Sequence, residues 1–454
     1  MQALSNHLQK YVSIAPLVIF RIIFGLMVLF STMRFMLKGW VYDLYIAPKF
    51  FFTYYGLDWV VPFSKYGMYT VFVLMLVSAI GIILGYFYKL STITFFLLFT
   101  YVELLDKTNY LNHYYFVSLV SFLLIIVPAG NHFSLDVFYK RTKKILEVPN
   151  WTIDIFKFQV GVVYFFAGVA KLNYHWLIEA QPLTNWLKHQ TDLPAIGALL
   201  KYKFTAFAFA WGGALYDLTI PFLLLSSRYR LLGYFLVVVF HTLTAVMFPI
   251  GVFPYVMIGS TLIFFSSNFH QKCLDYLSDW FKNTNNQSNS SVSKYQYSPP
   301  LKSLLILFVI IQLALPFRYL LYPGKLFWTE QGYRFSWRVM LIEKVGYAQF
   351  SIKDKSIDGE LIVDNSTYLT PQQEKMMATQ PDMILQYAHY LKATFKDSTW
   401  QENNTTIAIT NPVITVDSKV VLFNQGSRTF INPTTNLAEL KRGWHSKNWI
   451  LAYE

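Results

Sequence analysis

Long apolar segments separated by short polar stretches dominate the first 320 residues. A helix of about 20 apolar residues is long enough to cross the roughly 30 Å hydrocarbon core of a bilayer. The polar stretch DKTNYLN lies between two of the shorter segments and predicts a tight turn near one membrane interface. The pattern therefore predicts a polytopic α-helical membrane protein with about nine transmembrane helices, at residues 16–36, 68–88, 91–106, 113–128, 156–171, 204–225, 231–248, 253–267 and 301–320.

After Pro323 the pattern changes to one of short alternating segments. YAQFSIKD and GELIVDN flank an Asp358-Gly359 turn, and TTIAITNPVITVDSKVVLF alternates as strands do. PDMILQYAHYLKATF has the three-to-four spacing of an amphipathic helix. We therefore predict a transmembrane helical domain at 1–322 and a mostly β extramembrane domain at 323–454 with a helix near 381–396. The polar, Ser/Asn-rich stretch at about 281–300 predicts a flexible linker.

Composition strengthens the membrane prediction, because 54% of the residues are hydrophobic and only 14% are charged. The net charge of +13 resembles that of nucleic-acid-binding proteins. However, the basic residues lie mostly between the apolar segments, which favours contact with membrane lipid headgroups and argues against a nucleic-acid partner. Cys273 is the only cysteine, so no disulfide can form within the chain.

The basic loops predict an orientation. Lys140, Arg141, Lys143 and Lys144 follow the fourth predicted span, and Arg228 and Arg230 lie between the sixth and seventh. The positive-inside rule places both loops in the cytoplasm. With nine spans the N-terminus and the 281–300 linker are then cytoplasmic, and the C-terminal domain is outside. The membrane would be a bacterial inner membrane, or that of the endoplasmic reticulum in a eukaryote.

Ionisable side chains within apolar segments are the candidates for chemistry. A charged side chain at the bilayer centre costs about 2.5 to 3.5 kcal/mol on insertion scales, so such residues are usually paired or functional. For Arg21 and Asp217 we favour an interhelical ion pair that fixes packing. The other candidates are Glu103, Asp106, Lys107, His113, Lys171 and His241.

Lys171 ends the apolar run that begins at Phe158, and two interpretations fit it. It is either a helix-end lysine whose amine reaches the headgroups or a buried amine that serves as a base in a water-excluding pocket. His113 follows Asn112 at the start of a span, where an interfacial or capping role and a functional role are both open. His241 lies deeper in the bilayer, where a histidine more often lines a cavity than faces lipid.

Several stretches resemble the vitamin K-dependent γ-glutamyl carboxylase family. The match runs in order through VIFRIIFGLMV, LLDKTNYLNHYYF, VYFFAGVAKLNYHW, WGGALYDL and VVVFHTLTAVMFPIGVFPYVM. It continues in the C-terminal domain through GYRFSW, PDMILQYAHYL and NPTTNLAEL. It thus covers nearly the whole chain.

The resemblance implies a coupled reaction and a set of site residues. A reduced vitamin K (a naphthohydroquinone) reacts with O2 to give its epoxide, and the strong base formed on the way lets CO2 add to a glutamate of a peptide or protein substrate. Lys171 takes the place of the family's base, Asn112 and His113 match its active-site pair, and His241 matches a histidine of a later span. Tyr333 and Trp337 match the segment implicated in glutamate binding.

The chain also departs from the family pattern. Animal members have a longer outer region, a pair of cysteines, and a histidine where this chain has Ile342. The chain resembles a shorter, bacterial-type member, for which a quinone epoxidase without carboxylase activity is an alternative. A non-enzymatic membrane module in peptide maturation or export is another. No spacing of cysteines and histidines indicates a metal site, so no tightly bound metal is implied, and the sequence does not define the oligomeric state.

Overall fold

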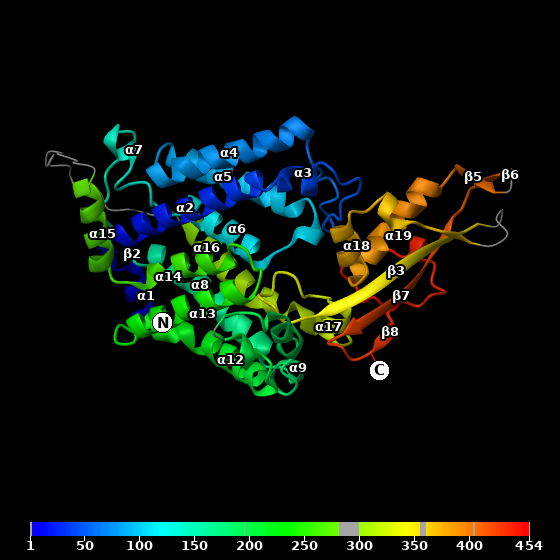
Figure 1. Ribbon diagram of the computed structural model, residues 1–454. Coiled ribbons are helices and arrows are strands. Elements are labelled where there is room, and N and C mark those ends of the chain that lie inside the picture. The colour runs from blue at the N-terminus through cyan, green and yellow to red at the C-terminus, as the bar shows by residue number, and fades with distance from the viewer. Residues whose placement is uncertain (1, 195, 281–298, 355–359, 403–404, 454) are drawn as a thin grey trace. The chain divides into compact units, whose positions relative to one another are not determined.

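A computed structural model describes residues 2–194, 196–280, 299–354, 360–402 and 405–453. The chain divides into two compact units, coloured along the sequence in Figure 1. The first unit comprises Met1–Tyr42, Phe63–Val102 and Leu111–Ala314, and the second comprises Asp43–Pro62, Glu103–Tyr110 and Leu315–Glu454. Two segments that lie among the predicted spans, 43–62 and 103–110, thus belong with the C-terminal region.

The first unit is helical. Its long helices pack in sequence-distant pairs, of which α2 with α4 and α8 with α12 are the most extensive. A small antiparallel pair of strands, β1 (Tyr11–Ser13) and β2 (Glu147–Pro149), joins the starts of α2 and α8. The helices are α1 (Gln2–Gln9), α2 (Ala15–Leu37), α3 (Trp40–Tyr45, which continues into the second unit), α4 (Lys65–Leu84), α5 (Tyr88–Leu104), α6 (Asn112–Ile126), α7 (Leu135–Phe138), α8 (Trp151–Lys171), α9 (Tyr174–Leu177), α10 (Leu183–Trp186), α11 (Gly197–Leu200), α12 (Lys203–Leu225), α13 (Arg230–Met247), α14 (Phe253–Thr261), α15 (Ser267–Trp280) and α16 (Pro299–Ala314).

Local sequence explains where these helices begin and end. Ser64 caps α4, since its side chain accepts a hydrogen bond from the backbone N–H of Gly67. The same helix ends at Gly85, whose φ of 60° is readily adopted only without a Cβ. Proline occupies the first turn of α2 and of α14, where its missing N–H costs nothing.

Six helical stretches within the described residues are long and apolar enough to cross a membrane: Ala15–Leu37, Lys65–Leu84, Trp151–Lys171, Lys203–Leu225, Arg230–Met247 and Pro300–Leu321. Each predicted span coincides with a helix, but α5, α6 and the helical stretch Phe253–Phe264 are shorter than 18 residues. The membrane-protein class is therefore supported, whereas the predicted number of nine spans is not confirmed.

The second unit contains strands and helices. Its antiparallel sheet has the order β4-β3-β7-β8, formed by β3 (Lys344–Lys353), β4 (Leu361–Ile362), β7 (Val413–Leu422) and β8 (Ser427–Thr429). Separately, β5 (Ser398–Glu402) pairs antiparallel with β6 (Thr405–Ile409). The helices are α17 (Leu326–Thr329), α18 (Pro371–Met377) and α19 (Pro381–Phe395).

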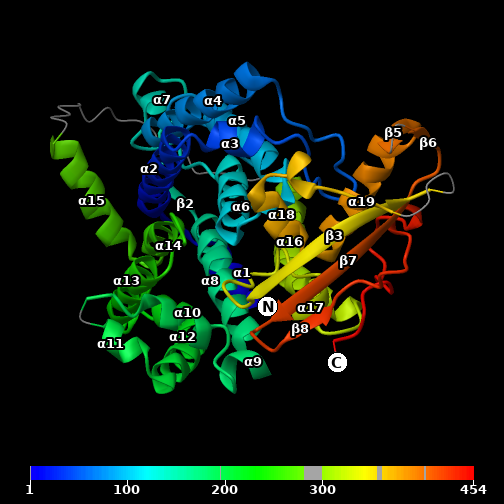
Figure 2. The same cartoon turned by 45° about the vertical axis from the view of Figure 1, so that its right-hand side comes forward.

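The core of this unit forms between the sheet and α19, which lie side by side in Figures 1 and 2. Buried residues alternate along β7, as expected for a strand with one covered face. On β3 the ring of Phe350 meets that of Tyr387 of α19 edge to face at 5.0 Å. β3, β6 and β7 lie in stretches that alternate in sequence, and α19 lies where the sequence has the spacing of an amphipathic helix. The Asp358-Gly359 turn and residues 281–298 of the predicted linker lie outside the described residues.

Candidate functional site

The C-terminal end of α8 places Lys171 beside α12. Its amine Nζ lies 2.6 Å from Oδ2 of Asp217 and 3.4 Å from the carbonyl oxygen of Ala167 one turn earlier. Lys171 is 6% exposed and Asp217 is 4% exposed, so this ion pair is buried within the first unit. The amine also lies 5.3 Å from the ring centroid of Trp176. The amine of Lys171 therefore points into the protein.

A glycine allows the two helices to approach. A Cβ at Gly168 would lie 2.8 Å from Cγ and 2.9 Å from the backbone N of Leu218 on α12, closer than real Cβ atoms come. Because Gly168 precedes Lys171 by three residues and Leu218 follows Asp217, the close approach occurs where the ion pair forms. This explains locally why the block VYFFAGVAK carries a glycine.

His241 is held by a second polar contact of α8. Its Nε2 lies 2.9 Å from the hydroxyl oxygen of Tyr164, and the histidine is 1% exposed. Among the described residues, its Nδ1 has no hydrogen-bond partner. Tyr164 precedes Lys171 by seven residues, two helical turns, so both side chains lie on one face of α8.

Phe253, the first residue of α14, connects His241 to His113. Its ring centroid lies 5.7 Å from that of His241 and 5.8 Å from that of His113. His113 is 8% exposed on the first turn of α6, and Asn112 beside it is half-buried. The structure thus brings His113 and His241 to one aromatic ring, while the hydrogen bonds of Lys171 go to Asp217 and Ala167.

Sequence reasoning missed Tyr164, and it assigned the wrong partner to Asp217. Tyr164 could have been found from its seven-residue spacing to Lys171 in an otherwise apolar helix. The predicted Arg21–Asp217 pair is wrong, because Asp217 binds Lys171.

Arg21 is fully buried and donates to three backbone carbonyls. Its Nη1 lies 3.0 Å from the oxygen of Ala129, and its Nη2 lies 2.7 Å from that of Phe133 and 3.4 Å from that of Ile83. These carbonyls lie at the end of α4 and in the loop after α6. The guanidinium therefore ties α2 to both, which is a packing role without a carboxylate partner among its hydrogen bonds.

Tyr333 and Trp337 lie in the second unit, in a segment of unusual backbone conformation. Glu330, Phe335, Trp337 and Met340 all have φ between 52° and 61°, a left-handed region that side chains with a Cβ adopt at a cost of about 1 to 3 kcal/mol. Such strain tends to persist at binding sites. Trp337 is buried, and burial together with Glu330 raises the pKa of Tyr333, which keeps its hydroxyl protonated.

Asp106 and Lys107, considered from sequence as membrane-embedded charges, also belong to the second unit. The carboxylate of Asp106 caps the turn that follows it, with Oδ1 2.8 Å from the backbone N of Thr108. Lys107 Nζ lies 2.8 Å from Oδ2 of Asp382. Among the described residues, no group of three or more His, Cys, Asp or Glu is arranged to hold a metal ion.

These features define a helical membrane protein with a buried lysine–aspartate pair and an attached strand-containing unit. Comparison with known protein families supports this class of protein. Residues 9–269 match the family model described as the HTTM domain, and residues 297–454 match that of the vitamin K-dependent gamma-carboxylase lumenal domain. The chain therefore belongs to the vitamin K-dependent gamma-carboxylase family. No solved structure matches the chain.

Proposed function

We propose that this protein is a vitamin K-dependent peptidyl-glutamate carboxylase in which Lys171 is the base that starts the reaction. The observation that carries this proposal is the buried ion pair between Lys171 and Asp217. The strong base formed from the hydroquinone survives only where water is excluded, and the 6% exposure of Lys171 meets this condition. Family membership supports vitamin K as co-substrate and glutamate-containing proteins as substrates.

The overall reaction balances as follows. The naphthohydroquinone, O2, CO2 and a glutamyl γ-C–H give the quinone epoxide, γ-carboxyglutamate and water. Lys171 accepts the first proton from the hydroquinone hydroxyl after the proton of its ion pair with Asp217 has left the site. The ammonium that forms pairs again with Asp217, and the negative charge passes to the hydroquinone anion. The strong base formed from the hydroquinone takes the glutamyl γ-proton, which leaves in water, and the carbanion that remains forms a C–C bond to CO2.

The remaining site residues have supporting roles in this proposal. His241 and His113 flank Phe253, and His241 is oriented by the hydroxyl of Tyr164. A flat ring next to two imidazoles is suited to an aromatic co-substrate. We assign these residues, with Asn112, to the quinone side of the site and Tyr333 with Trp337 to the peptide side. We further propose that 323–454 lies outside the membrane and that the N-terminus is cytoplasmic.

The test compares two variants in membranes supplied with hydroquinone and a glutamyl peptide. We expect Lys171→Ala to abolish epoxide and γ-carboxyglutamate formation together. Because removing one partner of a buried pair costs about 3 to 5 kcal/mol, misfolding is a competing explanation. The double variant Lys171→Met/Asp217→Leu removes both charges and should fold but remain inactive. Epoxide formation by the folded double variant would rule out Lys171 as the base.

A quinone epoxidase without carboxylation is the closest alternative, and Ile342, two residues after the strained segment, favours it because animal members have a histidine there. Incorporation of labelled carbonate into a glutamyl peptide, measured beside epoxide formation, separates the two. Epoxide without incorporated label would establish the epoxidase. The label and the epoxide in equal amounts would establish the carboxylase.

A further inference from the structure

The second unit contains a cavity of about 130 Å³ that none of the assignments above uses. Its walls come from three parts of the unit: Tyr54 and Tyr55, Lys107, and the region from Arg318 to Lys447. Six basic side chains line it against two acidic ones, Glu330 and Asp382. The six are Lys107, Arg318, Arg334, Lys441, Arg442 and Lys447.

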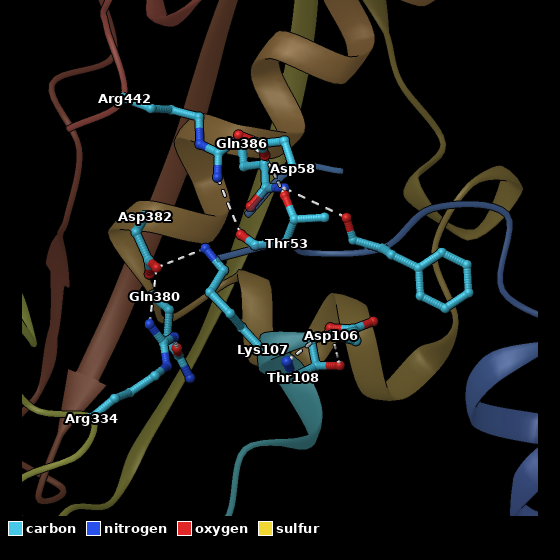
Figure 3. Close-up of polar contacts among 11 residues, drawn as sticks. Thr53, Asp58, Asp106, Lys107, Thr108, Arg334, Gln380, Asp382, Gln386 and Arg442 are labelled. Carbon is cyan, nitrogen blue, oxygen red and sulfur yellow. Dashed lines mark hydrogen bonds and ion pairs between the residues drawn. The ribbon is translucent and has the colours of Figure 1, made fainter. Parts of the chain in front are cut away.

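Asp382 does not cancel this charge, because two cations share it. Figure 3 shows its carboxylate between Lys107 and Arg334, with Oδ2 2.8 Å from Nζ and 2.9 Å from Nη1. Arg334 is fixed further by a hydrogen bond to the side-chain oxygen of Gln380. The nearby cations hold the pKa of Asp382 well below its ordinary value. The carboxylate therefore stays ionised and positions the two cations at the cavity.

The second acid, Glu330, is engaged elsewhere. Its Oε1 lies 2.9 Å from Nζ of Lys344, a residue that does not line the cavity. Arg442, which also lines the cavity, binds Asp58 at 2.6 Å and the backbone oxygen of Thr53 at 3.1 Å (Figure 3). For the ammonium of Lys447, the described residues provide no ion pair or side-chain hydrogen bond. The cavity therefore has a surplus of positive charge.

The volume of the cavity and the hydrogen-bond donors that line it indicate the kind of ligand that it can hold. Arginine presents a planar fork that matches a carboxylate with two hydrogen bonds, and lysine adds a mobile point charge. Tyr54, Phe335 and Trp444 supply apolar surface next to the cations, suited to the methylene groups of a side chain. A small volume with several cations favours a compact dianion over a single carboxylate.

We propose that this cavity binds the malonate-type side chain of γ-carboxyglutamate, and so holds the modified residue of the peptide in preference to unmodified glutamate. This inference rests on the proposed carboxylase function for the origin of its ligand. The cavity itself is built from residues of the second unit. It gives the unit a role beyond glutamate delivery, since retention of the product keeps the peptide bound while further glutamates are modified.

The experiment measures peptide binding to the full chain in detergent at low salt, without quinone or CO2. Capped tripeptides carry γ-carboxyglutamate, glutamate or phosphoserine at the central position. We expect the γ-carboxyglutamyl peptide to bind about tenfold more tightly than the glutamyl peptide. Lys447→Gln should bring this ratio close to one, and Lys447→Arg should keep it. Lys375→Gln, at an exposed lysine of α18 away from the cavity, is the matched control.

Three outcomes would overturn the proposal: equal affinity for the γ-carboxyglutamyl and glutamyl peptides, an unchanged ratio in both Lys447→Gln and Arg442→Gln, or tighter binding of the phosphoserine peptide. The last would make the cavity a phosphate site. Carboxylation is assayed separately on a peptide with one glutamate. A protein that binds selectively but does not carboxylate would contradict the proposed function and leave the cavity assignment standing.

Discussion

In the proposed reaction, the Lys171–Asp217 pair contributes to both stability and chemistry. Withdrawing two charges from water is costly, and the 2.6 Å contact offsets this cost only while both partners are present. Loss of either partner leaves a buried charge, whereas replacement of both by apolar side chains of similar volume is often neutral. Single substitutions at this pair therefore confound folding with catalysis, and a double substitution separates them.

Lys107 permits a prediction of pH dependence at the cavity of the second unit. Burial lowers the pKa of Lys107 to about 8, with Asp382 opposing the shift and Arg334 and Arg442 adding to it. Raising the pH from 7 to 9 therefore removes this charge from the cavity. We expect the affinity for the γ-carboxyglutamyl peptide to fall about fivefold over this interval.

Deprotonation of Lys107 lowers the affinity for the peptide but raises the stability of the folded protein. In the unfolded chain the lysine titrates near its ordinary pKa of 10.5, so between about pH 8 and 10.5 the unfolded state binds more protons than the folded state. The contribution of Lys107 to the free energy of unfolding therefore rises with pH in this window. Lys107→Arg is the control, because a guanidinium stays charged. If this variant loses affinity from pH 7 to 9 as the unmodified protein does, Lys107 is not the titrating group.

At the scale of elements, the contact of α8 with α12 sets the geometry of the site. Gly168→Val would place side-chain atoms where Leu218 now lies and would push the helices apart. Overpacking of this kind costs about 1 to 3 kcal/mol, and we expect turnover to fall with it because Lys171 and Asp217 are drawn apart. Thermal unfolding and epoxide formation measure the two effects.

Gly212 of α12 provides the matched control for this substitution. A Cβ at Gly212 meets no atom within 4 Å. Gly212→Ala should therefore be neutral or stabilise the helix by up to about 1 kcal/mol, because alanine is the better helix former. An active, stable Gly168→Val protein would show that close approach of α8 and α12 is not required.

The helices were predictable because apolar runs of membrane length are visible in sequence. The contacts between the helices were not predictable. The partner of Asp217 depends on the rotation and depth of α8 and α12, and a hydropathy pattern gives neither. The predicted nine spans counted α5, α6 and α14 by composition, although the structure makes them short. Tyr164 escaped notice because a tyrosine in an apolar helix is common.

The second unit shows why ion pairs and cavities between distant segments could not be predicted from the sequence. Lys107 and Asp382 form an ion pair across 275 positions of sequence, and nothing near Lys107 indicates where its partner lies. The resemblance identified Tyr333 and Trp337 through a short motif. In contrast, the basic cavity combines residues from three distant segments, which only the fold brings together.

At the scale of the whole molecule, the orientation in the membrane is the prediction that decides where peptide substrates can enter. The basic loops predict that the second unit faces outward, and the proposed reaction requires the unit to lie on the same side as its charged glutamyl peptide, which cannot cross the bilayer. The single native cysteine makes this testable by labelling. Cys273→Ser provides a cysteine-free background into which one exposed cysteine is introduced at a time.

We expect a membrane-impermeant maleimide to label Ser427→Cys, at the start of β8, in intact cells or sealed right-side-out vesicles. Lys143→Cys, in the basic loop before β2, should be labelled only after the membrane is opened. Both positions are exposed, so a difference in labelling reflects the side of the membrane. The reverse pattern would invert the topology, and labelling of both sites before opening would mean that the chain crosses the membrane an even number of times between them. Under the predicted arrangement, five spans separate the two positions, so opposite sides are the required result.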